Sequence, residues 1–257
     1  MQNAAFQALG LEARYEAREI APPELEEALD ALHAEGYAGL NLTAPLKEVV
    51  WPLLAGATSE AESLRSVNTL KRLEKGWEGH ATDGLGFAAW AREVSLVSPG
   101  ARVLLIGAGG AARSAAPYLA ALGASAVTVV ARSASRAAAV TAHGERRNGG
   151  TGWSAIALEE PPEEGPFDLL VRALSTPALA PGEDAWWAAL GDGAMVFDMN
   201  YGARADDVRR AARTAKLRHA DGLGMLLHQG ALSFTYWTGR EAPLDAMRLA
   251  LERAAGE

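Results

Sequence analysis

The strongest indication of fold in this chain is the stretch Val103-Leu104-Leu105-Ile106-Gly107-Ala108-Gly109-Gly110-Ala111-Ala112-Arg113-Ser114-Ala115. An aliphatic run typical of a buried strand is followed by a glycine cluster and then by an alanine-rich helical pattern. Gly107 permits a sharp turn, and Gly109 and Gly110, which carry no Cβ, allow a pyrophosphate to approach the backbone closely. A helix that starts near Ala111 would direct its free N–H groups at the phosphates. The stretch therefore predicts a dinucleotide site.

The glycine spacing, Gly-x-Gly-Gly-x-x-x-Ala, is a variant of the common fingerprint and is a weak signal by itself. A glycine-rich turn between a strand and a helix, with no ligand, gives the same pattern. Further strands are expected at residues 127–132, near Trp153, and at residues 168–171 and 195–199, separated by helical or loop-like segments. This alternation predicts an α/β fold with a parallel sheet and right-handed crossovers.

The end of the second strand of this series bears on the choice of dinucleotide. Sites for NAD tend to place an acidic residue there, whereas sites for NADP place an arginine near the 2′-phosphate. The chain has Arg132, Ser133 and Arg136 at this point and no acid. The pattern favours NADP, although two solvent-facing arginines would have the same sequence.

Composition excludes several classes of protein. The chain has 257 residues, of which 49% are hydrophobic and 22% charged, as is usual for a globular protein. A net charge of −8 argues against nucleic acid as a partner. There are no cysteines, no apolar run long enough for a membrane span and no signal-peptide pattern, so we expect a cytoplasmic protein that does not act at a membrane. A monomer and a homodimer both fit.

The first third of the chain contains two charged residues at predicted helix starts. In residues 39–47, Leu40 and Leu42 alternate with Asn41 and Thr43 in a short strand, and Lys47 follows at the start of a helical run. A cation at a helix N-terminus opposes the macrodipole at a cost of about 0.3–1 kcal/mol, so a merely exposed lysine is poorly placed there. Asp83 precedes another helical run, where an ordinary N-cap and a catalytic role are both compatible with an aspartate.

Other short elements complete the expected fold. Residues 14–20 alternate enough to predict a strand, Pro22 and Pro23 open a helix that ends at Gly36, and residues 66–70 predict a strand followed by a hairpin turn at 72–77. The five histidines show no metal-ligand spacing, so no metal site is predicted. There is no Gly-x-Ser-x-Gly elbow and no Gly-Lys-Ser/Thr phosphate loop.

Five segments, in this order, resemble the shikimate dehydrogenase family, and they extend over nearly the whole chain. They are Asn41-Leu42-Thr43-Ala44-Pro45-Leu46-Lys47, Ser66-Val67-Asn68-Thr69, Thr82-Asp83-Gly84-x-Gly86, Gly107-Ala108-Gly109-Gly110-Ala111 and Gly222-Leu223-Gly224-Met225-Leu226-Leu227-x-Gln229. The first of these, Asn-x-Thr-x-Pro-x-Lys, is specific to the family. Asp198-Met199-Asn200-Tyr201 is similar to a further family segment, Asp-Met-x-Tyr.

The resemblance implies reversible reduction of 3-dehydroshikimate to shikimate by NADPH, on the pathway to chorismate and the aromatic amino acids. It implies that Lys47 and Asp83 form the catalytic pair, because hydride delivery to a ketone builds negative charge on oxygen, which a positioned cation or acid must meet. The implied substrate-binding residues are Thr43, Asn68, Tyr201 and Gln229. The implied cofactor-binding residues are Gly107, Ala108, Gly109, Gly110, Ala111, Arg132, Ser133, Arg136, Gly222 and Met225.

The resemblance also implies two domains: residues 1–83 with 223–257 for the substrate, and residues 84–222 as a Rossmann-type domain for NADP. The last helices are expected to pack back on the first domain. The family begins with a strand and a loop with two serines that hold the substrate carboxylate, whereas this sequence starts inside the helix that follows. We expect an upstream start rather than a lost strand, because removing a core strand would leave backbone groups unpaired.

Two other departures concern the cofactor. Val171-Arg172-Ala173-Leu174-Ser175 stands where the family often has Asn-Ala-Thr, so Arg172 and Leu174 are expected to disturb local cofactor contacts. Ala131 replaces the usual Asn of an Asn-Arg-Thr/Ser turn, which is a milder change. Two alternatives stay open: a related enzyme acting on quinate or another polyol acid, and a truncated, inactive NADP-binding protein.

Overall fold

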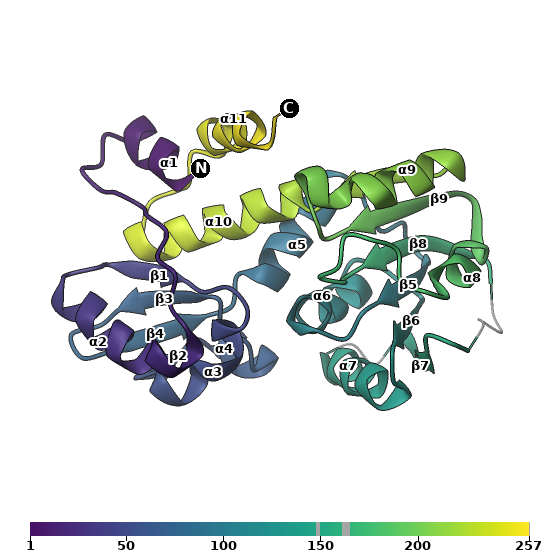
Figure 1. The fold of residues 1–257 in the computed structure, drawn as a ribbon, viewed down its shortest axis with the longest axis horizontal. Coiled ribbons are helices and arrows are strands. Elements are labelled where there is room, and N and C mark those ends of the chain that lie inside the picture. The colour runs from purple at the N-terminus through teal and green to yellow at the C-terminus, as the bar shows by residue number, and fades with distance from the viewer. Residues whose placement is uncertain (148–149, 161–164, 257) are drawn as a thin grey trace. The chain divides into compact units, whose positions relative to one another are not determined.

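The computed structural model describes residues 1–147, 150–160 and 165–256 (Figure 1). By its backbone contacts the chain divides into two compact units. Unit 1 comprises Met1–Gly86 and Leu227–Glu257, and unit 2 comprises Phe87–Leu226. The two divisions in the chain lie a few residues beyond the predicted boundaries at 83 and 222. The assignment of substrate to one unit and of NADP to the other stays a prediction.

Unit 1 contains a four-stranded sheet in the order β1-β3-β4-β2. Strands β3 and β4 pair antiparallel with Thr69 opposite His80 and Arg72 opposite Trp77, so the predicted hairpin is confirmed. Strand β1 pairs antiparallel with β3, and β2 pairs parallel with β4. The strands are β1 (Gly39–Asn41), β2 (Gly56–Ala57), β3 (Thr69–Arg72) and β4 (Trp77–His80).

Short helices cover this sheet, and their apolar faces form its core with Leu70 and Trp77. In helix α2 the buried positions Leu25, Leu29 and Leu32 recur at helical spacing. The elements on the N-terminal side are α1 (Gln2–Ala8), the 3₁₀ turn η1 (Pro22–Glu24), α2 (Leu25–Ala34), α3 (Leu46–Val49), the 3₁₀ turn η2 (Trp51–Leu53) and α4 (Ser59–Leu64).

The strand predicted at residues 14–20 is wrong, because this segment has no regular secondary structure. Its alternating charged side chains bond locally instead: Arg18 donates to Glu16, Glu35 and Tyr37. Among the described strands the sheet ends at β1 on that side, and β1 pairs only with β3. The alternation of side chain types in residues 14–20 therefore corresponds to a cluster of ion pairs and not to a strand.

The C-terminal part of unit 1 is helical. Helix α10 (Leu223–Thr238) starts in unit 2 and continues into unit 1, and α11 (Leu244–Ala255) follows it. Helix α1 packs with these helices, with the rings of Phe6 and Phe234 5.4 Å apart and Met247 fully buried beside them. The C-terminal helices thus pack with the N-terminal one, as expected for the last part of the chain.

Unit 2 contains a six-stranded sheet in the order β10-β9-β8-β5-β6-β7, and all its strand pairs are parallel. The order reverses at β5, since β6 lies on one side of it and β8 on the other. In doubly wound sheets, ligands bind at the carboxyl ends of the strands at this switch point. The strands are β5 (Arg102–Ile106), β6 (Ala126–Ala131), β7 (Gly152–Ala157), β8 (Phe167–Arg172), β9 (Leu190–Asp198) and β10 (Arg218–Asp221).

Residues 103–106 of β5 are buried, as a central parallel strand requires. Leu104 and Ile106 belong to the cluster that contains Trp186 of α8 and Val208 of α9. The helices of this unit are α5 (Asp83–Glu93, which starts in unit 1), α6 (Gly110–Ala121), α7 (Ala134–Arg147), α8 (Glu183–Trp187), the 3₁₀ turn η3 (Gly202–Ala205) and α9 (Asp206–Thr214). The α/β fold with a parallel sheet is confirmed.

Candidate active site and dinucleotide site

Lys47 and Asp83 form an ion pair in unit 1. Lys47 Nζ donates to Asp83 Oδ2 at 2.6 Å, and the two side chains are 27% and 15% exposed. Lys47 lies in the single turn of α3 just after Pro45, and Asp83 is the first residue of α5. The pair is therefore largely shielded from water yet reachable by a small molecule, as proton exchange with a ligand requires.

Asn68 joins this pair to a wider hydrogen-bond network. Its amide nitrogen donates to Asp83 Oδ1 at 2.9 Å and to Gln229 Oε1 at 3.3 Å, and its amide oxygen accepts from the Thr82 backbone N–H at 2.7 Å. Both carboxylate oxygens of Asp83 are thus engaged, one by Lys47 and one by Asn68. The structure brings together four of the residues predicted from the sequence: Lys47, Asn68, Asp83 and Gln229.

Three side chains of this network were not predicted as site residues. Ser233 Oγ lies 2.8 Å from Thr69 Oγ1 and 3.3 Å from Thr82 Oγ1, and it also receives the Asn41 amide at 3.0 Å. Thr69, Thr82 and Ser233 are fully buried. The available signal was the position of Ser233, four residues after Gln229 on the same helix, which places both on one face.

A close approach of two helices positions Gln229. A methyl group at Gly86 of α5 would lie 2.5 Å from the Gln229 backbone nitrogen and 2.6 Å from its Cβ. Only a residue without a Cβ fits there, so Gly86 allows α10 to bring Gln229 next to Asn68. The Gly-x-Gly after Asp83 therefore has a packing role in addition to any role in binding.

The structure does not place the other predicted substrate residues in this network. Thr43 is exposed, and its carbonyl oxygen accepts the Lys47 backbone N–H at 3.3 Å. Tyr201 belongs to unit 2, immediately before η3, and is 42% exposed. Their contacts with a substrate stay predictions.

The glycine turn of unit 2 has the open backbone that a dinucleotide requires. Gly107 follows β5 with φ +126°, and a methyl group on it would lie 2.5 Å from the Ala173 carbonyl oxygen. Apart from the adjoining chain and the backbone of α6 itself, no described atom lies within 4 Å of a methyl group placed on Gly109 or on Gly110. Gly109 is the N-cap of α6, so the free N–H groups of a twelve-residue helix lie beside this opening.

The end of β6 carries the two predicted arginines. Arg132 and Arg136 are exposed, and within the described residues no ion pair engages either guanidinium. Ser133 precedes α7, and its hydroxyl accepts the Arg136 backbone N–H at 3.4 Å. Ala131, the milder departure, is buried and pairs with Ala157 in the sheet. The open glycines and these two exposed cations together fit a dinucleotide with an additional phosphate.

Gly222 and Met225 follow β10, a strand that the sequence analysis missed because its residues are polar. A methyl group at Gly222 would lie 2.3 Å from the Met199 carbonyl oxygen, so this glycine lets the start of α10 pack against the end of β9. Met225 is partly exposed within the first turns of α10. Their proximity to a nicotinamide stays a prediction.

Arg172, which the sequence analysis expects to disturb local cofactor contacts, is the last residue of β8, and its side chain is turned inward. Its side chain is 0% exposed and pairs with Glu183, whose side chain is also 0% exposed, at 2.9 Å. Leu174 is partly buried beside the core cluster of α8 and α9. The arginine is therefore internal to unit 2 and does not project into solvent at the glycine turn. Its effect on cofactor binding stays a prediction.

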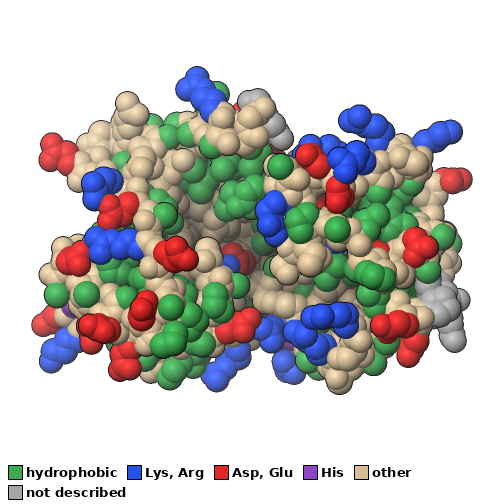
Figure 2. All heavy atoms as spheres, in the orientation of Figure 1, with side chains coloured by type: hydrophobic (Ala, Val, Ile, Leu, Met, Phe, Trp, Pro, Cys, Tyr) green, Lys and Arg blue, Asp and Glu red, His purple; other side chains and the backbone are tan. Residues whose placement is uncertain are grey.

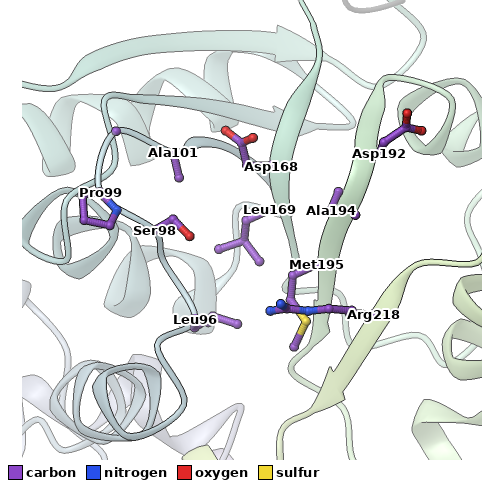
Figure 3. A pocket seen from close by; sticks show the side chains of 12 residues that line it. Leu96, Ser98, Pro99, Ala101, Asp168, Leu169, Asp192, Ala194, Met195 and Arg218 are labelled. Atoms are coloured by element: carbon purple, nitrogen blue, oxygen red, sulfur yellow. The ribbon is translucent and has the colours of Figure 1, made fainter.

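Unit 2 has a hollow of about 250 Å³ at the amino ends of the sheet strands, opposite to the end that carries the glycine turn (Figure 3). Asp168, Asp192 and Arg218 supply its charged groups, and Leu169 and Met195 line its apolar part (Figure 3). Because the hollow lies at the starts of β8, β9 and β10, it is separate from the glycine turn at their carboxyl ends.

Other features of the described residues bear on the class of protein. No three His, Asp or Glu side chains among them gather as a metal site. None of the described helices is both long and apolar enough to cross a membrane. Acidic and basic side chains are interspersed over the face seen in Figure 2.

A doubly wound parallel sheet with an open glycine turn, joined to a second unit that carries a Lys–Asp pair, defines an α/β oxidoreductase of the dinucleotide-binding class. Three family models match the chain: "Shikimate dehydrogenase substrate binding domain" at residues 1–70, "Shikimate / quinate 5-dehydrogenase" at 91–151 and "Shikimate 5'-dehydrogenase C-terminal domain" at 222–252.

Relatives and solved structures agree with these matches. The chain is 37% identical to the shikimate dehydrogenase (NADP(+)) of Geobacter metallireducens, over 96% of this chain and 88% of that protein. The chain is 31% identical in sequence to shikimate 5-dehydrogenase from Thermus thermophilus, which was solved in complex with shikimate. The two structures match with a TM-score of 0.80, over 100% of this chain and 93% of the other. The solved structure of a 5-ketofructose reductase of a Gluconobacter strain matches with a TM-score of 0.80 and 30% sequence identity, over 98% of this chain and 91% of the other. The chain belongs to the shikimate dehydrogenase family.

Proposed function

We propose that this chain is an NADP-dependent shikimate dehydrogenase that interconverts 3-dehydroshikimate and shikimate. The observation that carries the proposal is the Lys47–Asp83 pair at 2.6 Å, held by Asn68. Family membership and the named activity of relatives such as the Geobacter enzyme support it. The open glycine turn and the exposed Arg132 and Arg136 support NADP as the cofactor.

When bound, NADP(H) supplies or accepts the hydride. The chain's own residues manage the charge and the proton. In the direction of reduction, negative charge develops on the carbonyl oxygen, and the Lys47 ammonium stabilises it and donates a proton. In the direction of oxidation, the neutral amine form of Lys47 takes up the hydroxyl proton and becomes the ammonium again. Asp83 fixes the position of Nζ, and Asn68 fixes the carboxylate of Asp83 through its other oxygen.

The remaining polar groups would orient the substrate. Gln229 and Asn68 present amide groups that match the hydroxyls of a polyol, since an amide both donates and accepts hydrogen bonds. Thr43 and Tyr201, which the resemblance to the family implies as substrate residues, would add hydroxyl groups. Gly109, Gly110 and the start of α6 would hold the pyrophosphate, with Gly107, Ala108 and Ala111 shaping the turn, and Arg132, Ser133 and Arg136 would hold the 2′-phosphate. Gly222 and Met225 would lie beside the nicotinamide.

A second candidate activity is reduction of a different polyol ketone. The similarity to a 5-ketofructose reductase favours it, because that protein shares the fold at nearly the same identity. Quinate or another polyol acid is a related possibility within the family.

Substrate profiling tests the proposal. The chain is assayed with shikimate, quinate and fructose as hydride donors, with NADP⁺ and NAD⁺ as acceptors, by the absorbance of the reduced nicotinamide. We expect the highest kcat/KM with shikimate and NADP⁺. A higher kcat/KM with fructose or quinate would overturn the choice of substrate. NADP⁺ binding without turnover of any donor would identify an inactive dinucleotide-binding protein instead.

A further inference from the structure

Arg172 is the last residue of β8, at the carboxyl edge of the sheet, and its fully buried guanidinium contacts a single loop twice. Nη1 donates to the Thr176 carbonyl oxygen at 2.9 Å, and Nη2 donates to the Ala178 carbonyl oxygen at 2.6 Å. Both carbonyls belong to the β8–α8 loop, residues 173–182. The planar guanidinium fork therefore fixes this loop at two points.

Two buried carboxylates lie beside the Arg172 guanidinium. Nε donates to Glu183 Oε1 at 2.9 Å, and Nη1 lies 3.6 Å from Asp198 Oδ1. Glu183 Oε2 also accepts the Ala180 backbone N–H at 2.7 Å, at the end of the same loop. Burial raises the pKa of Asp198. A buried ion pair adds little stability over an apolar packing, so the distinctive effect of Arg172 is the fixed conformation of the loop.

The loop is in direct contact with the glycine turn. The Ala173 backbone N–H donates to the Ile106 carbonyl oxygen at 2.8 Å, and the Ala173 carbonyl is the group that a side chain at Gly107 would strike. On the other side, the Asn200 amide donates to the Leu174 carbonyl oxygen at 2.9 Å and to Asp198 Oδ1 at 3.0 Å. The end of β9 and the glycine turn thus both meet the segment that Arg172 holds.

We propose that Arg172 is a positioning residue of the dinucleotide site, which holds the β8–α8 loop in its ligand-binding conformation before the dinucleotide arrives. This inference rests on the proposed function only in taking NADP as the ligand of the glycine turn. Because the loop is fixed in advance, binding loses less conformational entropy and affinity is higher. Loss of the fork affects the dinucleotide and leaves the binding of the polyol by unit 1 unchanged.

Two variants separate the fork from the charge. Arg172→Lys keeps a buried cation but loses the rigid fork that reaches both loop carbonyls. The double variant Arg172→Met/Glu183→Met removes the ion pair from both sides, so no unpaired Glu183 carboxylate is left buried. Arg218→Met is the matched control, because this exposed arginine lies at the opposite edge of the same sheet (Figure 3).

The dissociation constant of NADP⁺ is measured by titration calorimetry, together with the KM values for NADP⁺ and shikimate and the Tm. We expect both Arg172 variants to raise the Kd and KM for NADP⁺ about tenfold, with the KM for shikimate unchanged and the control like wild type. A lowered Tm with an unchanged Kd and KM would make Arg172 merely structural and overturn the proposal. Absence of NADP⁺ binding by the wild type would instead overturn the proposed function.

A measurement on the wild-type chain keeps the test independent of whether the variants fold. Amide hydrogen exchange of residues 173–182 is followed with and without NADP⁺. We expect slow exchange at Ala173 and Ala180 before NADP⁺ is added, because their N–H groups are hydrogen-bonded to the Ile106 carbonyl and to the Glu183 carboxylate that Arg172 holds. Fast exchange that becomes slow only with NADP⁺ would contradict the proposal.

Discussion

Arg132 and Arg136 are the residues on which we expect the choice of NADP to depend. Both guanidinium groups are exposed and outside any ion pair that engages the described residues, so a phosphate can bind them without displacing a carboxylate. The sequence allowed this prediction because the end of β6 lacks an acid. Neither the position of the loops nor any long-range packing was needed for it.

The double variant Arg132→Gln/Arg136→Gln tests this assignment. Each charge-assisted hydrogen bond contributes about 1.5–3 kcal/mol, so the loss of both should raise the KM for NADP⁺ at least about a hundredfold. The KM for NAD⁺ should change little, because NAD⁺ has no 2′-phosphate. Steady-state kinetics with both dinucleotides measure the effect, with Arg218→Gln as control. An equal loss for NADP⁺ and NAD⁺ would contradict a role at the 2′-phosphate.

His80 makes the stability of unit 1 dependent on pH. Its Nδ1 lies 2.8 Å from Thr58 Oγ1, its ring contacts that of Tyr236, and burial lowers the pKa of its imidazole below the usual 6.5. The folded chain therefore holds fewer protons on His80 than the unfolded chain does. Its stabilising contribution is present above pH 6.5 and is lost as pH falls through the lower folded pKa.

We expect the free energy of unfolding to fall between neutral and mildly acidic pH, and the fall to be smaller in His80→Gln. Burial also lowers the pKa of His219, which contributes with the same sign in both proteins, so the difference between them isolates His80. Urea denaturation at a series of pH values measures it. A steeper fall in the variant than in the wild type would contradict this assignment.

At the scale of elements, the close approach of two helix backbones positions a residue of the candidate site. Helices α5 and α10 approach so closely that a methyl group at Gly86 would lie 2.5 Å from the Gln229 backbone. We expect Gly86→Ala to destabilise the chain by about 1–3 kcal/mol, because the two helices must move apart. The same shift should raise the KM for shikimate through Gln229.

Gly56→Ala is the matched control for this prediction, since no described atom beyond its two chain neighbours lies within 4 Å of a methyl group there. Chemical denaturation and steady-state kinetics measure both variants. A Gly86→Ala variant as stable as Gly56→Ala would contradict the close approach of α5 and α10.

The elements also show what could be predicted from the sequence. Apolar runs such as residues 103–106 and the hairpin at residues 72–77 were found, because buried strands and turns have local signatures. The segment 14–20 and strand β10 were misread because their local patterns do not match the structure that they form. In the former, alternating charges form ion pairs, and in the latter, Arg218–Asp221 joins the sheet through its backbone pairing with β9. Neither partner is visible locally in the sequence.

The candidate site was predictable to a similar degree. Lys47, Asp83, Asn68 and Gln229 were found through the resemblance, and the structure joins them in one network. Ser233 and Thr69 were not assigned as site residues, because the sequence does not show that two hydroxyls so far apart in the chain meet each other. Arg172 was recognised as unusual, but only the structure shows that its charge is turned inward, onto Glu183 and the loop.

At the scale of the whole molecule, the two units have separate tasks in the proposed reaction. Unit 1 contains the Lys47–Asp83 pair and the amides of Asn68 and Gln229. Unit 2 contains the glycine turn, Arg132 and Arg136. Tyr201 is the one proposed substrate residue that belongs to unit 2. The catalytic pair should control kcat without controlling affinity for NADP⁺.

The most direct test is the kcat for shikimate oxidation by Lys47→Ala, at saturating shikimate and NADP⁺, with the variant Lys75→Ala, in the exposed hairpin turn, as control. We predict that Lys47→Ala lowers kcat by about a hundredfold to ten-thousandfold, the range of general acid–base catalysis, while its Kd for NADP⁺ and the activity of the control equal those of wild type. Undiminished turnover by Lys47→Ala would contradict the account.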